Sequence, residues 1–337
     1  MNAKDFPIEY FYNEIATKFN MIFTTITALI TVSMAPFYLY IVLTQSKSLG
    51  TYRFFILNHS IWTICAEICF GFSKTCMLMP GTAGFILGPL GKIGGIKMTT
   101  YFFLVDCLFM LFTIIGMTMS LIYRYTSIFP GRTKEIGTSK WMIVTCLIIQ
   151  LAISVLLCII ADKFLSLDHD TMARKAIEFS PALSKFTNEP TFVFIDREFG
   201  FPMVIAVWIT LIIISVLFGI VATTLFFELK HNRYAVKKLE LQKTLILSCI
   251  VQIGITIVFL FIPIMVFFYY LTFGYVYAGP ITMIVFCVFC LHAIAEMVAT
   301  IYFVLPYRRF VMKRLLNIRQ EKSNTVVPSL ANTFNKF

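Results

Sequence analysis

Hydrophobic residues along this chain form long unbroken runs rather than an alternating pattern. Seven runs reach the roughly 20 residues that a helix needs to cross a hydrocarbon layer of about 30 Å. They are rich in Leu, Ile, Val and Phe and lack the alternation of a barrel strand, so they are predicted to be helices. The predicted spans are residues 19–44, 54–73, 98–123, 141–161, 201–227, 244–271 and 278–305.

Composition supports a membrane protein. Apolar residues make up 59% of the chain and charged residues 13%, whereas soluble domains carry about 25% charged residues. Within the predicted spans the charged residues are three acids, Glu67, Asp106 and Glu296. We therefore expect an all-α membrane protein, a seven-transmembrane helix bundle with a GPCR-like topology.

Basic residues fall mainly in alternate loops. The segments 45–53, 124–140 and 228–243, together with the tail after residue 306, carry 18 of the 28 basic residues and four of the 17 acidic residues. Because basic loops stay in the cytoplasm, the N-terminus is predicted to lie outside and the C-terminus inside. Residues 1–18 then form an extracellular N-terminus. They are acidic rather than basic, so the first span is expected to direct insertion without a cleavable signal peptide.

Segments outside the spans carry predictions of their own. The long outer loop 162–200 is mixed in charge and is expected to form a lid over a pocket. Pro306 disfavours helical geometry at Leu305, which predicts a bend there. Residues 306–319 then form an amphipathic juxtamembrane helix on an anionic inner leaflet. The tail 320–337 is polar with little periodicity and is predicted to be disordered.

The placement of histidine and cysteine argues against metal chemistry. The four histidines are His59, His169, His231 and His292. They are scattered over both faces and the interior, whereas a metal-dependent membrane enzyme needs them clustered. A membrane enzyme of the metal-oxidase kind is therefore excluded, and no enzymatic activity, metal or cofactor is expected. Cys287 and Cys290 have metal-site spacing, but small buried residues are the favoured interpretation in an apolar helix. Whether Cys76 forms a disulfide stays open.

Polar residues inside the spans predict an interior network. Ionisable groups at membrane depth are costly and indicate function. His292 and Glu296 lie one helical turn apart and share a face. With Glu67 and Gln252 they are expected to form a network that Asn58 is placed to join. Interhelical polar contacts contribute about 0.6–2 kcal/mol each, so the network suits either a switch or static support.

Asp106 marks a candidate ligand site. It lies about seven residues into its span, which corresponds to a depth of roughly 10 Å. The carboxyl group either pairs with a cationic ligand or stays neutral and hydrogen-bonded between helices. Nearby aromatic residues suit small apolar molecules, with lipid contact or packing as the alternative role. These residues are Tyr101, Phe102, Phe103, Phe268, Tyr269 and Tyr270.

Three further features concern signalling at the inner face. Arg124 is the first charge after Asp106, and its guanidinium group either donates to a partner protein or snorkels to headgroups. Pro263 is the predicted hinge of its helix, with a rigid kink as the alternative. The loop 228–243, which contains Arg233, is expected to extend two helices and suits a G protein or anionic lipid equally.

Several stretches resemble one receptor family. They are Tyr52-Arg53 followed by FFILNHSIW at 54–62, MPGTAGFILGP at 79–89, LQK at 241–243, Gln252 and Pro263, and His292 followed by Leu-Pro-Tyr-Arg at 305–308. Over about residues 20–320 the chain resembles a nematode seven-transmembrane chemoreceptor of the Str superfamily. It is most like serpentine receptor class H, with class I as the near neighbour.

The resemblance implies a plasma-membrane receptor on sensory cilia. Such a receptor binds a small environmental molecule outside and activates a heterotrimeric G protein inside, here through Arg124, Arg233, Tyr307 and Arg308. Tyr123-Arg124-Tyr125 stands where the rhodopsin-like pattern has Asp-Arg-Tyr, so an ion pair within the triplet is not assumed. No nucleic-acid partner is expected.

A seven-span ligand-gated channel or transporter is the alternative from another class. Channel-type invertebrate sensory receptors place the N-terminus inside, and ion-coupled transporters show internal repeats or broken helices. The loop charges predict the opposite orientation, and the two halves of the sequence show no convincing similarity. Both observations favour the G-protein-coupled receptor.

Overall fold

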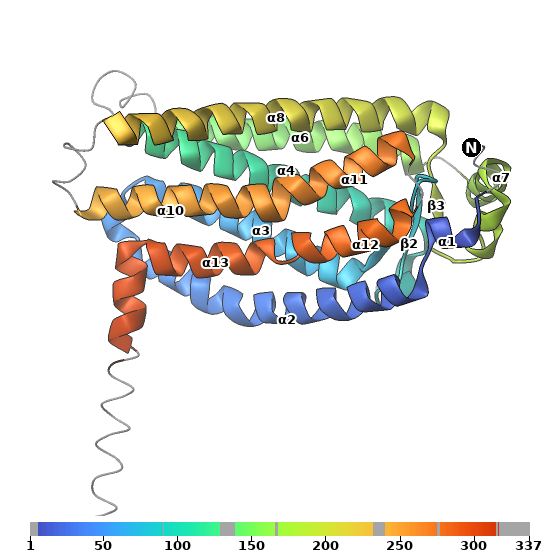
Figure 1. Cartoon of the computed structure of the whole chain (residues 1–337), viewed down its shortest axis with the longest axis horizontal. Helices are drawn as coiled ribbons and strands as arrows, with labels where there is room; N and C mark the ends of the chain where they lie inside the picture. The colour runs from blue at the N-terminus through green and yellow to red at the C-terminus, as the bar shows by residue number, and fades with distance from the viewer. Residues whose placement is uncertain are drawn as a thin grey trace, which may run out of the picture.

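The computed structural model describes residues 6–89, 91–128, 139–165, 168–231, 240–274, 277–314 and 316. The predicted tail 320–337 and Arg233 lie outside this part of the chain. Most of the described residues are helical, and the long helices run side by side along one axis (Figure 1).

Seven helical segments build the bundle. Among the described residues, six segments are long and apolar enough to cross a membrane, and Lys140–Leu156 forms a shorter apolar helix. The predicted all-α, seven-helix membrane fold is therefore confirmed. The elements, in chain order, are α2 (Glu14–Gln45), α3 (Tyr52–Ser73), α4 (Gly91–Ile128), α6 (Lys140–Leu165), α8 (Arg197–His231), the sixth segment of α10 (Glu240–Thr256), η4 (Ile257–Phe261) and α11 (Ile262–Phe273), and the seventh of α12 (Ala278–Phe289) and α13 (His292–Phe303).

The outer surface of the bundle is apolar. Leu147 and Leu151 of α6 are 56% and 65% exposed, and Ile213 and Leu217 of α8 are 54% and 55% exposed. Side chains of this kind belong in hydrocarbon, because a water-soluble surface rarely carries contiguous large apolar patches. The chain is a multi-pass membrane protein.

A three-stranded sheet closes one end of the bundle, which we call the sheet end (Figure 1). The strands pair antiparallel in the order β1-β2-β3, with Cys76 opposite Phe85 and Gly84 opposite Val193. Part of the long loop 162–200 thus folds onto the sheet through β3. The elements at this end are β1 (Thr75–Leu78), β2 (Ala83–Ile86), β3 (Val193–Phe194), α1 (Ile8–Phe11), α7 (His169–Phe179) and η3 (Pro181–Lys185).

The first strand has two different faces. Successive side chains of a strand point to opposite sides of the sheet. Cys76 and Leu78 are buried in an apolar cluster that includes Phe11, next to α1 and α7. Thr75 and Met77 instead line a cavity on the bundle side. One strand therefore anchors the sheet and shapes the space beneath it.

At the opposite end of the bundle, which we call the basic end, the chain changes direction after α13 and forms a further helix. Val304 is extended (φ −83°, ψ 108°) and ends α13. Residues 305–314 then form a helix that runs crosswise to the bundle (Figure 1). The break precedes Leu305, where the bend was expected, because Pro306 fits the first turn of the new helix, where its missing N–H is not needed.

Burial fixes this crosswise helix to the bundle. The side chain of Tyr307 is fully buried, and its hydroxyl lies 2.5 Å from Oγ of Ser46, which precedes η2 (Lys47–Leu49). Arg309, Lys313 and Arg314 are exposed. The helix therefore has one face in the apolar core and a basic face directed away from it.

The buried position of Cys76 predicts low reactivity. Burial raises the pKa of the Cys76 thiol to about 12, and the thiolate is the reactive form. At pH 8 we expect native Cys76 to react with a maleimide at least about a hundredfold more slowly than Lys185→Cys, an exposed position at the same end. Mass spectrometry of labelled peptides measures both rates, and similar rates would contradict the burial.

Candidate ligand cavity and interior polar cluster

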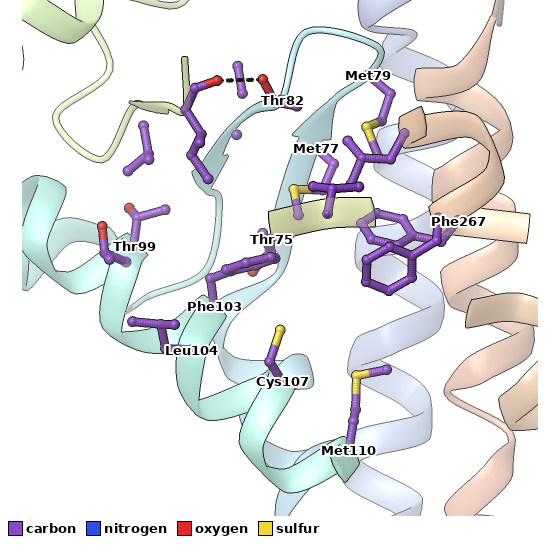
Figure 2. A pocket seen from close by; sticks show the side chains of 18 of the residues that line it. Thr75, Met77, Met79, Thr82, Thr99, Phe103, Leu104, Cys107, Met110 and Phe267 are labelled. Atoms are coloured by element: carbon purple, nitrogen blue, oxygen red, sulfur yellow. Dashed lines mark hydrogen bonds between the residues drawn. The ribbon is translucent and has the colours of Figure 1, made fainter. Parts of the chain in front are cut away.

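A cavity of about 190 Å³ lies beneath the sheet, between α4, α8 and α11. We call it the large chamber. Figure 2 shows Thr75 and Met77 above it and a row of α4 side chains, from Thr99 through Phe103 to Met110, along its side. Because the wall combines strands and helices distant in sequence, the large chamber exists only in the folded bundle.

The surface of the large chamber is almost wholly apolar. Its threonine hydroxyls are engaged elsewhere: Thr82 Oγ1 donates to the Ile195 carbonyl at 2.6 Å, and Thr99 Oγ1 to the Thr191 carbonyl at 2.6 Å. A protein cavity of about 150 Å³ lined by apolar side chains binds benzene. The large chamber is therefore of a size and chemistry that suit a small apolar molecule.

A small chamber of about 80 Å³ adjoins the large one and contains the side chain of Asp106. The two chambers share Phe103, Cys107 and Met110 of α4 and Phe267 of α11 as wall residues. Asp106 is 7% exposed, and its Oδ1 atom has no hydrogen-bond partner among the described residues. One carboxyl group thus lies at the edge of an otherwise apolar cavity system.

The predicted aromatic lining is found only in part. Phe103 and Phe268 line both chambers. Tyr101 is 50% exposed and Tyr269 is 39% exposed, and their side chains lie outside the chamber walls, as do those of Phe102 and Tyr270. Successive residues of a helix are rotated by about 100° around its axis. The side chains next to Phe103 and Phe268 in the sequence therefore point in other directions.

A polar cluster lies in the core of the bundle toward the basic end. Glu296 Oε1 accepts a hydrogen bond from Gln252 Nε2 at 2.9 Å and lies 3.0 Å from His59 Nε2. Gln252 Nε2 also donates to Thr300 Oγ1 at 2.9 Å. The cluster joins α3, α10 and α13 across the bundle. His59 and Glu296 are 1% exposed.

The geometry defines the protons held by His59 and Glu296. His59 Nδ1 lies 2.8 Å from the Phe55 carbonyl oxygen, which can only accept, so Nδ1 carries a hydrogen. The hydrogen bond between His59 Nε2 and Glu296 Oε1 requires one further proton, on either of the two atoms. Wherever that proton sits, the pair has no net charge, which lowers the cost of placing it at membrane depth.

The other members of the predicted network lie apart from this cluster. Glu67 and His292 line a separate small pocket, and among the described residues Glu67 Oε1 and His292 Nε2 have no hydrogen-bond partner. Asn58 accepts a hydrogen bond from Trp62 Nε1 at 3.1 Å. His59 was expected to be one of several scattered histidines. In the structure it is the partner of Glu296 in place of Glu67 and His292.

A glycine permits the close approach of α3 and α4 at the cluster. A Cβ atom on Gly116 would lie 2.9 Å from the Cβ atom of His59. Real Cβ atoms do not approach so closely, so any larger residue at 116 would displace α3. Gly116 therefore helps to set the position of His59 opposite Glu296.

Arg124 lies beside the polar cluster at the basic end. Its side chain is 5% exposed, and its guanidinium carbon lies 4.6 Å from the ring centre of Tyr52, which stacks on Tyr123 at 5.5 Å. Arg124 lines a small pocket together with His59 and Gln252. Of the other predicted coupling residues, Tyr307 is buried and Arg308 is half-buried.

Two helices are interrupted between the chambers and the cluster. The sixth segment has a π-helical turn, η4, that ends two residues before Pro263, and Pro263 lies on the small chamber wall. The seventh segment breaks at Cys290 and Leu291, between α12 and α13 (Figure 1). Such interruptions often mark functional sites in helices. Both connect the chamber walls to Gln252 and Glu296.

The hydrogen bond between His59 and Glu296 predicts energetic coupling between them. We expect His59→Ala and Glu296→Ala to be non-additive, with a coupling free energy of about 1–3 kcal/mol. Equilibrium unfolding of both single variants and the double variant in detergent micelles measures it. Asn58→Ala combined with Glu296→Ala is the matched control and should be additive, because Asn58 bonds to Trp62. Additivity for His59 and Glu296 would contradict their direct interaction.

Comparison with known protein families shows which family the chain belongs to. Residues 16–317 match the model of the serpentine type 7TM GPCR chemoreceptor family Srh. No curated protein matches the sequence. The match covers most of the described bundle, including both chambers, the polar cluster and Arg124. The chain therefore belongs to the Srh family of serpentine seven-transmembrane chemoreceptors.

Proposed function

We propose that this chemoreceptor binds a small, largely apolar environmental molecule in the two chambers and thereby activates a heterotrimeric G protein at the basic end. The observation that carries the proposal is the large chamber of about 190 Å³ beneath the sheet. Ligand pockets are typically concave and apolar, with few polar groups that orient the ligand. Asp106 supplies such a group.

In the proposed orientation the sheet end faces outward and the basic end faces the cytoplasm. The excess of basic residues in alternate loops supports this placement. We propose that the receptor resides in the plasma membrane, and by family resemblance in sensory cilia. The exposed Arg309, Lys313 and Arg314 then approach the anionic inner leaflet, where each basic residue contributes about 1 kcal/mol of attraction.

Transmission through the bundle follows the two interrupted helices. A ligand that displaces Phe267 or Ile264 acts on α11, which contains Pro263 and directly follows η4. Thr256, at the other end of η4, hydrogen-bonds to the Gln252 carbonyl at 2.8 Å. Movement of the sixth segment would therefore disturb the hydrogen bonds that Gln252 donates to Glu296 and Thr300. A two-state element of this kind is what a receptor needs to carry a signal.

Arg124 is the proposed contact with the G protein. In this structure its side chain is covered by Tyr52 and lies beside the polar cluster. Separation of the helices at the basic end would expose the guanidinium group, whose five donors suit the carbonyls at the end of a partner helix. Tyr307, being buried, would act by positioning the crosswise helix, while Arg233 and Arg308 remain proposed surface contacts.

Filling the large chamber tests the ligand site. We expect Leu104→Trp to abolish second-messenger responses to every odorant that activates the wild type, because the indole occupies the large chamber. A panel of volatile and water-soluble odorants on expressing cells provides the measurement. Leu108→Trp, one turn along α4 and outside both walls, is the matched control and should respond. Unchanged responses in Leu104→Trp would contradict the proposed site.

Removing Arg124 tests coupling and orientation together. We expect Arg124→Ala to abolish odorant-driven second-messenger changes while cell-surface levels stay normal, because the variant loses the proposed G-protein contact and the stacking on Tyr52 that it also loses contributes only about 0.5–2 kcal/mol. An N-terminal epitope tag, stained without permeabilising the cells, reports the surface level. Staining that requires permeabilisation would overturn the orientation, and an intact response in Arg124→Ala would remove Arg124 from the mechanism.

A further inference from the structure

The small chamber combines one carboxyl group with an aromatic wall. Asp106 is more than nine-tenths buried, and its Oδ1 atom has no hydrogen-bond partner among the described residues. The thiol of Cys69 and the hydroxyl of Ser73, both on α3, interact with the same carboxyl group. These neutral groups leave one carboxyl oxygen available to a molecule in the chamber.

The surroundings of Asp106 lack a compensating charge. Among the described residues that line the two chambers, none is Lys, Arg or His. A carboxylate in a low-dielectric site without a cation is strongly disfavoured. A ligand that carries its own positive charge would remove this cost, and its N–H groups would satisfy Oδ1 by a charge-assisted hydrogen bond.

The aromatic wall also favours a cation. The rings of Phe70 and Phe286 pack edge to face with centres 5.1 Å apart, as do Phe267 and Phe268 at 5.2 Å. The faces of such rings are electron-rich and attract ammonium groups. The phenylalanines on this wall are Phe70, Phe103, Phe267, Phe268, Phe286 and Phe289.

The large chamber defines the rest of the ligand. Its hydroxyl groups at Thr82 and Thr99 are already bonded to backbone carbonyls. Figure 2 shows its side walls formed by Leu104, Cys107 and Met110 of α4 and by Phe267 of α11. This space accepts a compact hydrocarbon group and offers little to a second polar one.

We propose that the ligand class is a small primary, secondary or tertiary amine with one compact apolar group, whose ammonium group binds Asp106 in the small chamber while the hydrocarbon occupies the large chamber. An N–H is required to reach Oδ1, which distinguishes this class from quaternary ammonium compounds. The inference rests on the proposed role of the chambers as the ligand site and narrows that role to one chemistry.

Three probes of similar shape test the inference on the purified full-length receptor: benzylamine, benzyl alcohol and ethylbenzene. The concentration of each probe that gives half-maximal thermal stabilisation is measured. On the wild type we expect benzylamine to act at a concentration at least about tenfold lower than the other two, the size expected of one charge-assisted hydrogen bond. Asp106→Asn should remove this preference and still respond to ethylbenzene, which shows that the variant is folded.

Glu67→Gln is the matched control. It removes another buried acid that lies outside both chamber walls, so the preference for benzylamine should persist. Equal effects of benzylamine and benzyl alcohol on the wild type, or a preference that survives Asp106→Asn, would overturn the inference. In both cases binding of ethylbenzene would leave the proposed ligand site standing. Failure of all three probes to bind the wild type would overturn the ligand site as well.

Discussion

The bundle depends on the neutralisation of Glu296 at its centre. A carboxylate in hydrocarbon without partners would oppose the association of the helices around it. His59 and Gln252 both form hydrogen bonds with Oε1 of Glu296. Residues of three helical segments therefore meet at one oxygen atom. Because these contacts cross the bundle, the relative positions of α3, α10 and α13 are coupled, and Gly116 allows α4 to join them closely.

The chambers and the polar cluster form two layers of the bundle. The chambers lie under the sheet and are apolar except for Asp106, whereas the cluster lies toward the basic end beside Arg124. The π-helical turn η4 and the break between α12 and α13 separate the layers. In the proposed function, these interruptions are the points at which the sixth and seventh segments would adjust when a ligand occupies the chambers. This arrangement suits a receptor whose ligand and signalling partner never meet.

The sequence predicted the parts that depend on long-range composition. Apolar runs as long as a membrane span identify helices whatever the packing, so the fold class and the positions of Glu67, Asp106 and Glu296 within spans followed directly. The partner of Glu296 did not follow. His59 lies on the buried face of α3 with Thr63 and Glu67, and a helical projection of residues 52–73 would have drawn attention to it.

The sheet was missed for a different reason. Its strands have two to four residues, too few for a periodic signal. The pairing of Gly84 with Val193 also joins residues more than 100 positions apart. Neither local propensity nor spacing reveals such a contact. The chamber walls contributed by Thr75, Met77 and Val193 could therefore be identified only once the chain was folded.

The two faces of strand β1 contact different parts of the molecule. Cys76 and Leu78 face the apolar cluster that anchors the sheet, while Thr75 and Met77 face the large chamber. A substitution at Thr75 alters the wall of the chamber and leaves the apolar side chains of the cluster unchanged, whereas Met77 packs against both. Under the proposed function, sequence change at Thr75 would diversify what the receptor detects while the side chains that anchor the strand stay the same.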